Sequence, residues 1–260
     1  MKFNSIFIAS LCAILFLSSC QKDEESTTTP TPVAPQITYG EMELEMEHKF
    51  GAENFALGTA YLTASGEQVT FNTLKYYVSN IVLHNVDGST WAQPESYYLV
   101  DASNVSSTML HLHDVPTGDY SGITFTLGVD STRNVSGAQE GALSVANNMF
   151  WSWNTGYIFA KFEGISPQSS TGGFSYHCGG FQGPNNAIQV VTYNFTPATL
   201  RVRQESAPVV HMMVDAKNIF DSTGNEVTTA SLAMMHMPGP NARKIMSNFA
   251  AGIEFDHIHN

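Results

Sequence analysis

The sequence is short of cysteine and of basic residues. Its 260 residues hold three cysteines, at positions 12, 20 and 178, and only Cys178 lies outside the N-terminal segment. A disulfide framework is therefore excluded, and the fold must be stabilised by its core or by a bound ion. Lys and Arg total 11 against 23 Asp and Glu, a net charge of −12. A chain this acidic is poorly suited to bind nucleic acid or an anionic surface.

Catalytic motifs and long apolar runs are scarce as well. The sequence has no nucleophile motif, no paired-carboxylate signature and no glycine-rich phosphate loop, so we predict that the protein is not an enzyme. The apolar run from 6 to 17 is too short for a transmembrane helix. Together with Lys2 before it, the run is typical of a secretory signal.

Small residues and a cysteine follow that run. Leu17-Ser18-Ser19-Cys20 resembles a bacterial lipoprotein cleavage site. The resemblance implies that residues 1–19 are a lipoprotein signal peptide and that Cys20 carries the lipid that anchors the mature protein in a membrane. The acidic stretch 21–25 resembles the export signal of outer-membrane lipoproteins that face the cell exterior; the alternative is a solvated charge run. We therefore predict an outer-membrane, surface-exposed lipoprotein.

The chain after Cys20 divides by composition. Up to Gln36 it is mostly Ser, Thr and Pro, so we expect residues 20–36 to be the lipidated Cys and a disordered tether. Residues 37–260 contain no second linker and no internal repeat, and their length suits one core. We predict a single domain there.

Alternating apolar and polar residues predict that this domain is all-β, an antiparallel β-sandwich with one or two short helices. The segment 74–86 is apolar on both faces, as a central strand would be, and Asp87-Gly88 predicts a hairpin turn after it. A helix is predicted over 242–251, with Asn241 as its N-cap and Gly252 after it, and a second one over 215–220. One predicted strand face carries Met42, Leu44, Met46, His48 and Phe50.

Histidine and methionine are abundant, with nine His and eleven Met. The chain closes with His257-Ile258-His259, and residues two apart in a strand point the same way. We expect Ile253, Phe255 and both histidines to share one strand face, which would supply half of a metal site; the alternative is a solvated terminus. Imidazole with thioether suits copper, although most of the methionines are expected to fill the core.

Two further histidines are candidate ligands. His48 lies on an otherwise apolar face, so its ring either hydrogen-bonds to a neighbour or coordinates a metal. His177 precedes Cys178 and a glycine pair, and because adjacent strand residues face opposite ways we expect His177 to be the ligand and Cys178 a buried thiol. The favoured metal set is therefore His48, His177, His257 and His259.

Four blocks of sequence stand out: MFWSWNTGYIF at 149–159, LKYYVSNI at 74–81, YHCGG at 176–180 and FDHIH at 255–259. Together they resemble the MbnP-like family of copper-binding lipoproteins, related to the methanobactin-associated partner of a dihaem peroxidase. The likeness runs from about Gln36 to the end. It implies an extracytoplasmic protein that binds a copper ion, with a dihaem peroxidase as a partner.

The family resemblance also implies an unusual ligand, since some relatives bind copper through histidines and a tryptophan oxidised to kynurenine. This chain has Trp91, Trp151 and Trp153, and none of them is assigned to the modified position. For Trp151 or Trp153 we expect aromatic packing in the core.

The sequence favours two hypotheses for the function, which belong to different classes. The first is a copper-binding lipoprotein for copper acquisition, buffering or delivery, with the metal held mainly by histidines. The alternative is a metal-free β-sandwich that serves as an adhesion or ligand-binding module at the cell surface. A copper redox enzyme ranks third.

Overall fold

The computed structural model describes residues 36–137, 139–151 and 156–260. By its contacts the chain divides into Met1–Gln36 and Ile37–Asn260, and the fold below is that of the second unit. The proposed signal peptide, Cys20, the tether up to residue 35 and Trp153 lie outside the described residues. Among the residues that are described, no helix has the length and apolar character needed to cross a membrane.

Sheet A has five strands within the described residues. Its central strand β1 pairs in parallel with β13 and antiparallel with β7 and β2, and β15 is antiparallel to β13. The alternation predicted for β1 is confirmed, because its apolar residues are buried while the intervening glutamates are more exposed. The strands are β1 (Tyr39–Phe50), β2 (Glu53–Asn54), β7 (Met109–Pro116), β13 (Val209–Asp215) and β15 (Ile253–His259).

Sheet B has ten strands in the described part of the chain. The central strand predicted over 74–86 is confirmed up to Asn85 as part of β4, which pairs with both β8 and β9, and the turn at Asp87-Gly88 leads into β5. The strands are β3 (Ala60–Leu62), β4 (Gln68–Asn85), β5 (Thr90–Ala92), β6 (Tyr97–Asp101), β8 (Gly118–Leu127), β9 (Ile158–Ile165), β10 (Gly173–Gly179), β11 (Gln189–Asn194), β12 (Leu200–Val202) and β14 (Met234–Met235).

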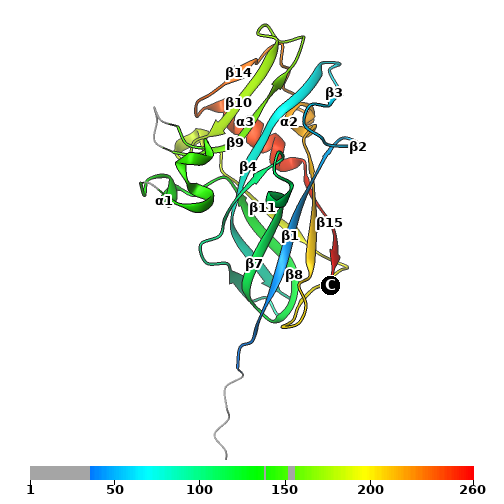
Figure 1. Cartoon of the computed structure of the whole chain (residues 1–260), viewed down its shortest axis with the longest axis vertical. Coiled ribbons are helices and arrows are strands. Elements are labelled where there is room, and N and C mark those ends of the chain that lie inside the picture. The colour runs from blue at the N-terminus through cyan, green and yellow to red at the C-terminus, as the bar shows by residue number, and fades with distance from the viewer. Residues whose placement is uncertain (1–35, 138, 152–155) are drawn as a thin grey trace, which may run out of the picture. The chain divides into compact units, whose positions relative to one another are not determined.

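The predicted all-β, sandwich-like fold is confirmed (Figure 1). Both sheets are mixed, however, because β1 with β13 and β10 with β14 pair in parallel. A parallel pair needs a long connection, and the segment between β1 and β13 includes most of sheet B. The antiparallel expectation is therefore wrong for these two pairs.

Helices are short, as predicted: α1 (Ser131–Asn134), α2 (Asn218–Asp221) and α3 (Pro240–Ala251). The N-cap of α3 is Gly239, not the predicted Asn241, because Pro240 already occupies the first helical position that proline favours. The helix predicted over 215–220 is reduced to α2, since Asp215 still belongs to β13. Single 3₁₀ turns occur at Val105–Thr108, Gly141–Leu143, Val145–Asn147 and Gly183–Asn185.

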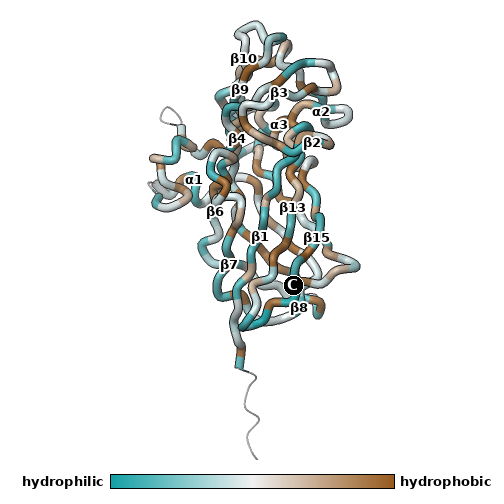
Figure 2. The backbone as a smooth tube through the Cα atoms, turned by 45° about the vertical axis from the view of Figure 1, so that its right-hand side comes forward, coloured by the Kyte–Doolittle hydropathy of each residue, from teal (hydrophilic) through white to brown (hydrophobic). Residues whose placement is uncertain are grey.

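Aromatic side chains fill the core between these elements. Phe249 on α3 packs against Tyr76 of β4 at 4.9 Å and against Phe162 of β9 at 5.0 Å between ring centroids, so the helix is fixed on sheet B. The hydropathy view shows apolar and polar stretches alternating along the strands of this unit (Figure 2). On sheet A, the apolar residues of β1 are buried on the inner face and its glutamates lie on the outer face, which carries the candidate site.

Candidate metal centre

The outer face of β1 presents a row of carboxylates at every second residue, from Glu41 to Glu47. Because β1 and β13 pair in parallel register, Glu45 lies beside His211. On the other edge of β13, His211 pairs with His257 of β15. A glutamate and two histidines from three strands thus lie side by side across the sheet, although they are distant in sequence.

A β-bulge in β15 sets which way the closing histidines point. Val214 pairs with Ile253 and Met212 with Phe255, but His211 pairs with His257, so Asp256 is an extra residue in the strand. Such a bulge changes which face the following residues present. The expectation that Ile253, Phe255 and the histidines share one face is therefore wrong: the first two face the core with Met212, and the histidines face outward with His211.

The three imidazoles form a compact cluster, with one nitrogen from each of His211, His257 and His259 lying within 4.8 Å of the others. The rings of His211 and His257 are stacked, with centroids 4.1 Å apart and planes at 7°. The Nε2 atoms of His257 and His259 are 3.0 Å apart. Two ligands of one ion, each bonded at about 2.0–2.1 Å as imidazole is to zinc, lie at a similar separation.

Carboxylates orient the rings of His211 and His257 through hydrogen bonds to Nδ1. The Nδ1 atom of His211 lies 3.0 Å from Glu45 Oε2 and 2.9 Å from Glu47 Oε1, and Nδ1 of His257 lies 2.8 Å from Asp256 Oδ2. An Nδ1–H that donates to a carboxylate fixes the tautomer in which Nε2 carries a lone pair. The same outer-shell pairing is found behind most histidines that bind metals.

The Nε2 atom of His211 is the most informative atom of the cluster. It is buried and has no hydrogen-bond partner among the described residues, on a side chain that is otherwise well bonded. An unpaired buried acceptor costs roughly 1–3 kcal/mol, and an ion bound to it would remove that cost. The donor set therefore fits a metal that prefers nitrogen ligands.

The four predicted ligands do not come together as one set. The structure brings His257 and His259 together with His211, whereas His48 lies on the inner face of sheet A and His177 lies on sheet B. Metal binding by His257 and His259 stays a prediction. His211 was missing from the favoured set, although its place between Val210 and Met212 in an alternating segment was a signal that it faces away from the core.

His48 lies near the C-terminal end of β1 and has a hydrogen-bond partner. Its Nε2 atom hydrogen-bonds to the hydroxyl of Tyr76 at 3.0 Å, and its ring packs edge-on against Tyr76 and at a tilt against Phe55. Of the two roles that the sequence left open, the structure provides the hydrogen bond. Burial lowers the pKa of His48 from its ordinary 6.5 to about 4, so the ring is neutral at pH 7.

This shift predicts an acid-dependent loss of stability. Between pH 6.5 and about 4 the unfolded state binds a proton at His48 that the folded state does not. The contribution of His48 to stability is therefore fully present above pH 6.5 and is lost as the pH falls toward 4. The expected contribution is up to about 3 kcal/mol. Urea unfolding at pH 7 and pH 4.5 checks this: the loss should be smaller in His48→Gln, which keeps a partner for Tyr76. An equal loss in both proteins would contradict it.

Cys178 and Trp151 are core residues, as predicted. Both are buried, and burial raises the pKa of the Cys178 thiol well above its usual range, so the thiol is not a reactive nucleophile. Trp151 lies in the hydrophobic core next to Gly179. Trp91 is only partly buried.

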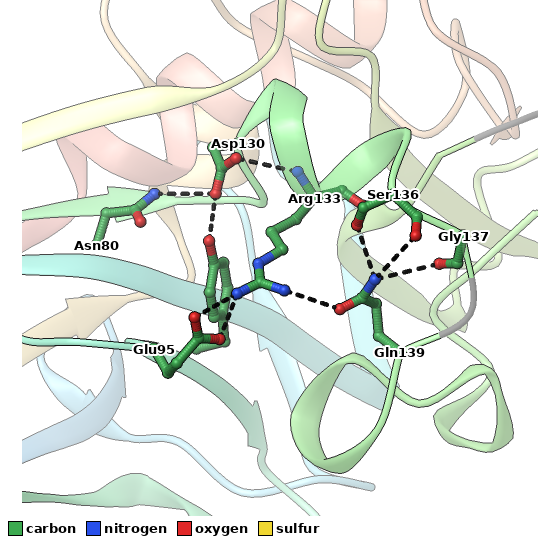
Figure 3. Close-up of polar contacts among 8 residues, drawn as sticks. Asn80, Glu95, Asp130, Arg133, Ser136, Gly137 and Gln139 are labelled. Atoms are coloured by element: carbon green, nitrogen blue, oxygen red, sulfur yellow. Dashed lines mark hydrogen bonds and ion pairs between the residues drawn. The ribbon is translucent and has the colours of Figure 1, made fainter.

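Another polar cluster connects β6 with α1 through hydrogen bonds and an ion pair (Figure 3). The Tyr97 hydroxyl donates to Asp130 Oδ2 at 2.5 Å, and Arg133 pairs with Glu95 while its guanidinium lies over the Tyr97 ring. Burial, with Asp130 second, raises the pKa of Tyr97 to about 12, which keeps its hydroxyl a donor. The charged groups here pair with one another, so the histidine cluster on sheet A is the better candidate for binding an ion.

The fold and this cluster define a class: an all-β, sandwich-like protein with a three-histidine cluster, backed by carboxylates, on one sheet. Comparison with known proteins gives the family. The MbnP family model matches residues 39–238, and the chain therefore belongs to the MbnP family. The matched range ends before β15, so His257 and His259 lie outside it.

A solved structure shares the fold. MbnP from Methylosinus trichosporium superposes with a TM-score of 0.51 at 13% sequence identity, covering 80% of this chain and 87% of that one. At this identity the likeness shows the fold alone. No curated protein sequence matches the chain.

Proposed function

We propose that this protein binds copper through His211, His257 and His259 and serves copper acquisition, buffering or delivery. The observation that carries the proposal is the buried, unpartnered Nε2 of His211 beside two more imidazoles, with all three nitrogens within 4.8 Å. Membership of the MbnP family supports it. Three imidazole nitrogens suit several transition metals. Among the divalent ions of the first transition row, copper binds such sites most tightly.

Each residue has a distinct part in holding the ion. His211 is the buried ligand, oriented by Glu45 and Glu47, while His257 is half-buried and His259 is exposed. Burial thus decreases from His211 to His259, and the His259 side of the cluster is open to solvent. A site with an exposed ligand exchanges its ion more readily than an enclosed one, which suits delivery or buffering.

The remaining expectations belong to the same proposal. Cys20 would carry the lipid anchor, and the acidic stretch after it would direct the protein to the outer face of the outer membrane. A dihaem peroxidase is the partner that the family resemblance implies. We propose no catalytic turnover, since the cluster serves to hold an ion.

The carboxylates provide a test. Changing Glu45 and Glu47 together to Gln keeps side-chain size but removes the charges that orient His211, so copper affinity should fall about 10–100-fold. The measurement is competition for Cu(II) with a chelator of known affinity. The matched control is Glu41→Gln with Glu43→Gln, which pair with His113 and His111 on the same face. An equal loss in the control would contradict a specific role for Glu45 and Glu47.

The alternative, a metal-free ligand-binding module, has one structural feature in its favour. A hollow of about 560 Å³ lies beside β7, and its lining includes Trp91, Tyr98 and Asp114. Aromatic faces with nearby polar groups suit a glycan or peptide. Ligand binding that is abolished by Trp91→Ala, in a protein that takes up no copper, would favour this function over the first.

A further inference from the structure

A second histidine cluster lies on sheet B, on the face that points away from the core. In β10, Ser175 and His177 are half-buried while their neighbours Phe174, Tyr176 and Cys178 are buried. The edge strand β14 pairs in parallel with β10, placing Met234 beside Ser175. His236 follows directly after β14, and its ring lies against the ring of His177.

The two histidines are in direct contact. Their rings are stacked, with centroids 3.9 Å apart and planes at 14°. The Nε2 atom of His236 lies 2.6 Å from Ser175 Oγ, and Nε2 of His177 lies 3.5 Å from the same oxygen and 2.7 Å from Glu163 Oε1. The Nε2 atoms of both histidines thus lie near the Ser175 hydroxyl, with the Glu163 carboxylate next to His177.

Sulfur is available at the same place. His236 stands within the run Met234-Met235-His236-Met237, and Met234 and Met237 are 58% and 60% exposed. The backbone register places Met234 beside Ser175, the residue whose hydroxyl contacts both histidines. The run also lines an apolar hollow of about 500 Å³. Exposed thioethers are rarely needed for packing, whereas thioether and imidazole together are the ligands that reduced copper prefers.

The charge state of the cluster suits a cation. Burial lowers the pKa of both His177 and His236, so the rings are neutral at pH 7, the form in which imidazole binds a metal. Lys161, the nearest strand neighbour of His177, directs its ammonium group to the carbonyl oxygen of Asn148. Glu163 supplies a negative charge to balance a monovalent ion.

We propose that His177 and His236, with the thioether of Met234 beside them, form a second metal site that is selective for a soft monovalent ion, Cu(I). The site is separate from the cluster on sheet A: β10 and β14 lie at one end of the folded unit and the C-terminal end of β15 lies toward the other (Figure 1). It does not depend on the sheet A cluster. Binding there replaces the hydrogen bonds that the two Nε2 atoms make to Ser175 and Glu163, and the proton on Nε2 of the neutral His177 ring moves to Nδ1 through solvent, so that Nε2 is free to bind the ion.

Silver(I), a soft ion without redox chemistry, is the probe for this site. In the protein with His211→Ala and His257→Ala, which leaves a single histidine of the sheet A cluster, we expect one equivalent of Ag(I) to remain bound by equilibrium dialysis. Adding His236→Ala should remove that equivalent. Adding His84→Ala instead, a lone histidine bonded to Thr124 on the same sheet, should leave it. Equal Ag(I) binding with and without His236 would overturn the proposal.

Two more readouts keep the test decisive. In the unsubstituted protein, Ag(I) should shift the imidazole nitrogen resonances of His177 and His236 in NMR spectra, a result that does not depend on the folding of any variant. Unchanged resonances would overturn the proposal. Met234→Leu should weaken Ag(I) about tenfold and leave Zn(II) binding unaffected. The outcome is independent of the sheet A site, because Cu(II) binding that is insensitive to His211→Ala would refute the proposed function and leave this site standing.

Discussion

Changing His211 to Ala is expected to lower Cu(II) affinity by more than about 100-fold, because orienting groups alone account for 10–100-fold at metal sites and His211 is a direct ligand. His211 is also the only one of the three cluster histidines that is buried, with two carboxylates on its Nδ1. The affinity is measured by competition with a chelator of known strength. His257→Ala should give a loss of similar size.

His113→Ala is the matched control for this prediction. His113 is an exposed histidine on the same face of sheet A, paired with Glu41 at 3.1 Å, and it does not belong to the three-histidine cluster. Its removal should leave Cu(II) affinity within about twofold. If His211→Ala and His113→Ala weaken binding equally, the ion is held by the acidic face in general and the assigned ligands are wrong.

Changing Phe71 to Ala should destabilise the folded protein by about 3–5 kcal/mol. Phe71 is fully buried at the centre of an aromatic group, with ring centroids 5.3 Å from Phe55, 5.2 Å from Phe174 and 6.0 Å from Phe220. The cavity left by truncation would lie where β4, β10 and α2 meet. The free energy of unfolding in urea, extrapolated to water, measures the effect.

Val190→Ala is the control for Phe71. Val190 is 67% exposed on β11, so its truncation should change the free energy of unfolding by less than about 0.5 kcal/mol. A loss below about 1 kcal/mol for Phe71→Ala would show that the aromatic group is not part of the cooperative core.

Much of the fold could be read from periodicity. The alternation of β1 and the two-sided apolar pattern of β4 follow from burial, since β1 covers the core with a single face and β4 is buried on both faces at Tyr76–Ser79. The flanking proline and glycine predict α3, although the predicted cap, Asn241, lies two residues after the observed cap, Gly239. These features depend on residues that are near in sequence.

The candidate site depends on contacts that periodicity does not encode. Glu47 and His211 are 164 residues apart and meet only because β1 and β13 pair in parallel. The outward direction of His257 and His259 depends on the single extra residue Asp256, and a regular strand would have turned them toward the core with Phe255. The sequence predicts that His257 and His259 lie close together, whereas His211 joins them only through the pairing of β13 with β15.

A crystal grown with copper gives the most direct test of the central claim. Anomalous scattering at the copper edge should show a peak about 2.0–2.1 Å from ring nitrogens of His211, His257 and His259, with Nδ1 of His211 still bonded to Glu45 and Glu47. A copper-loaded protein in which no anomalous peak lies at these three histidines would contradict the account.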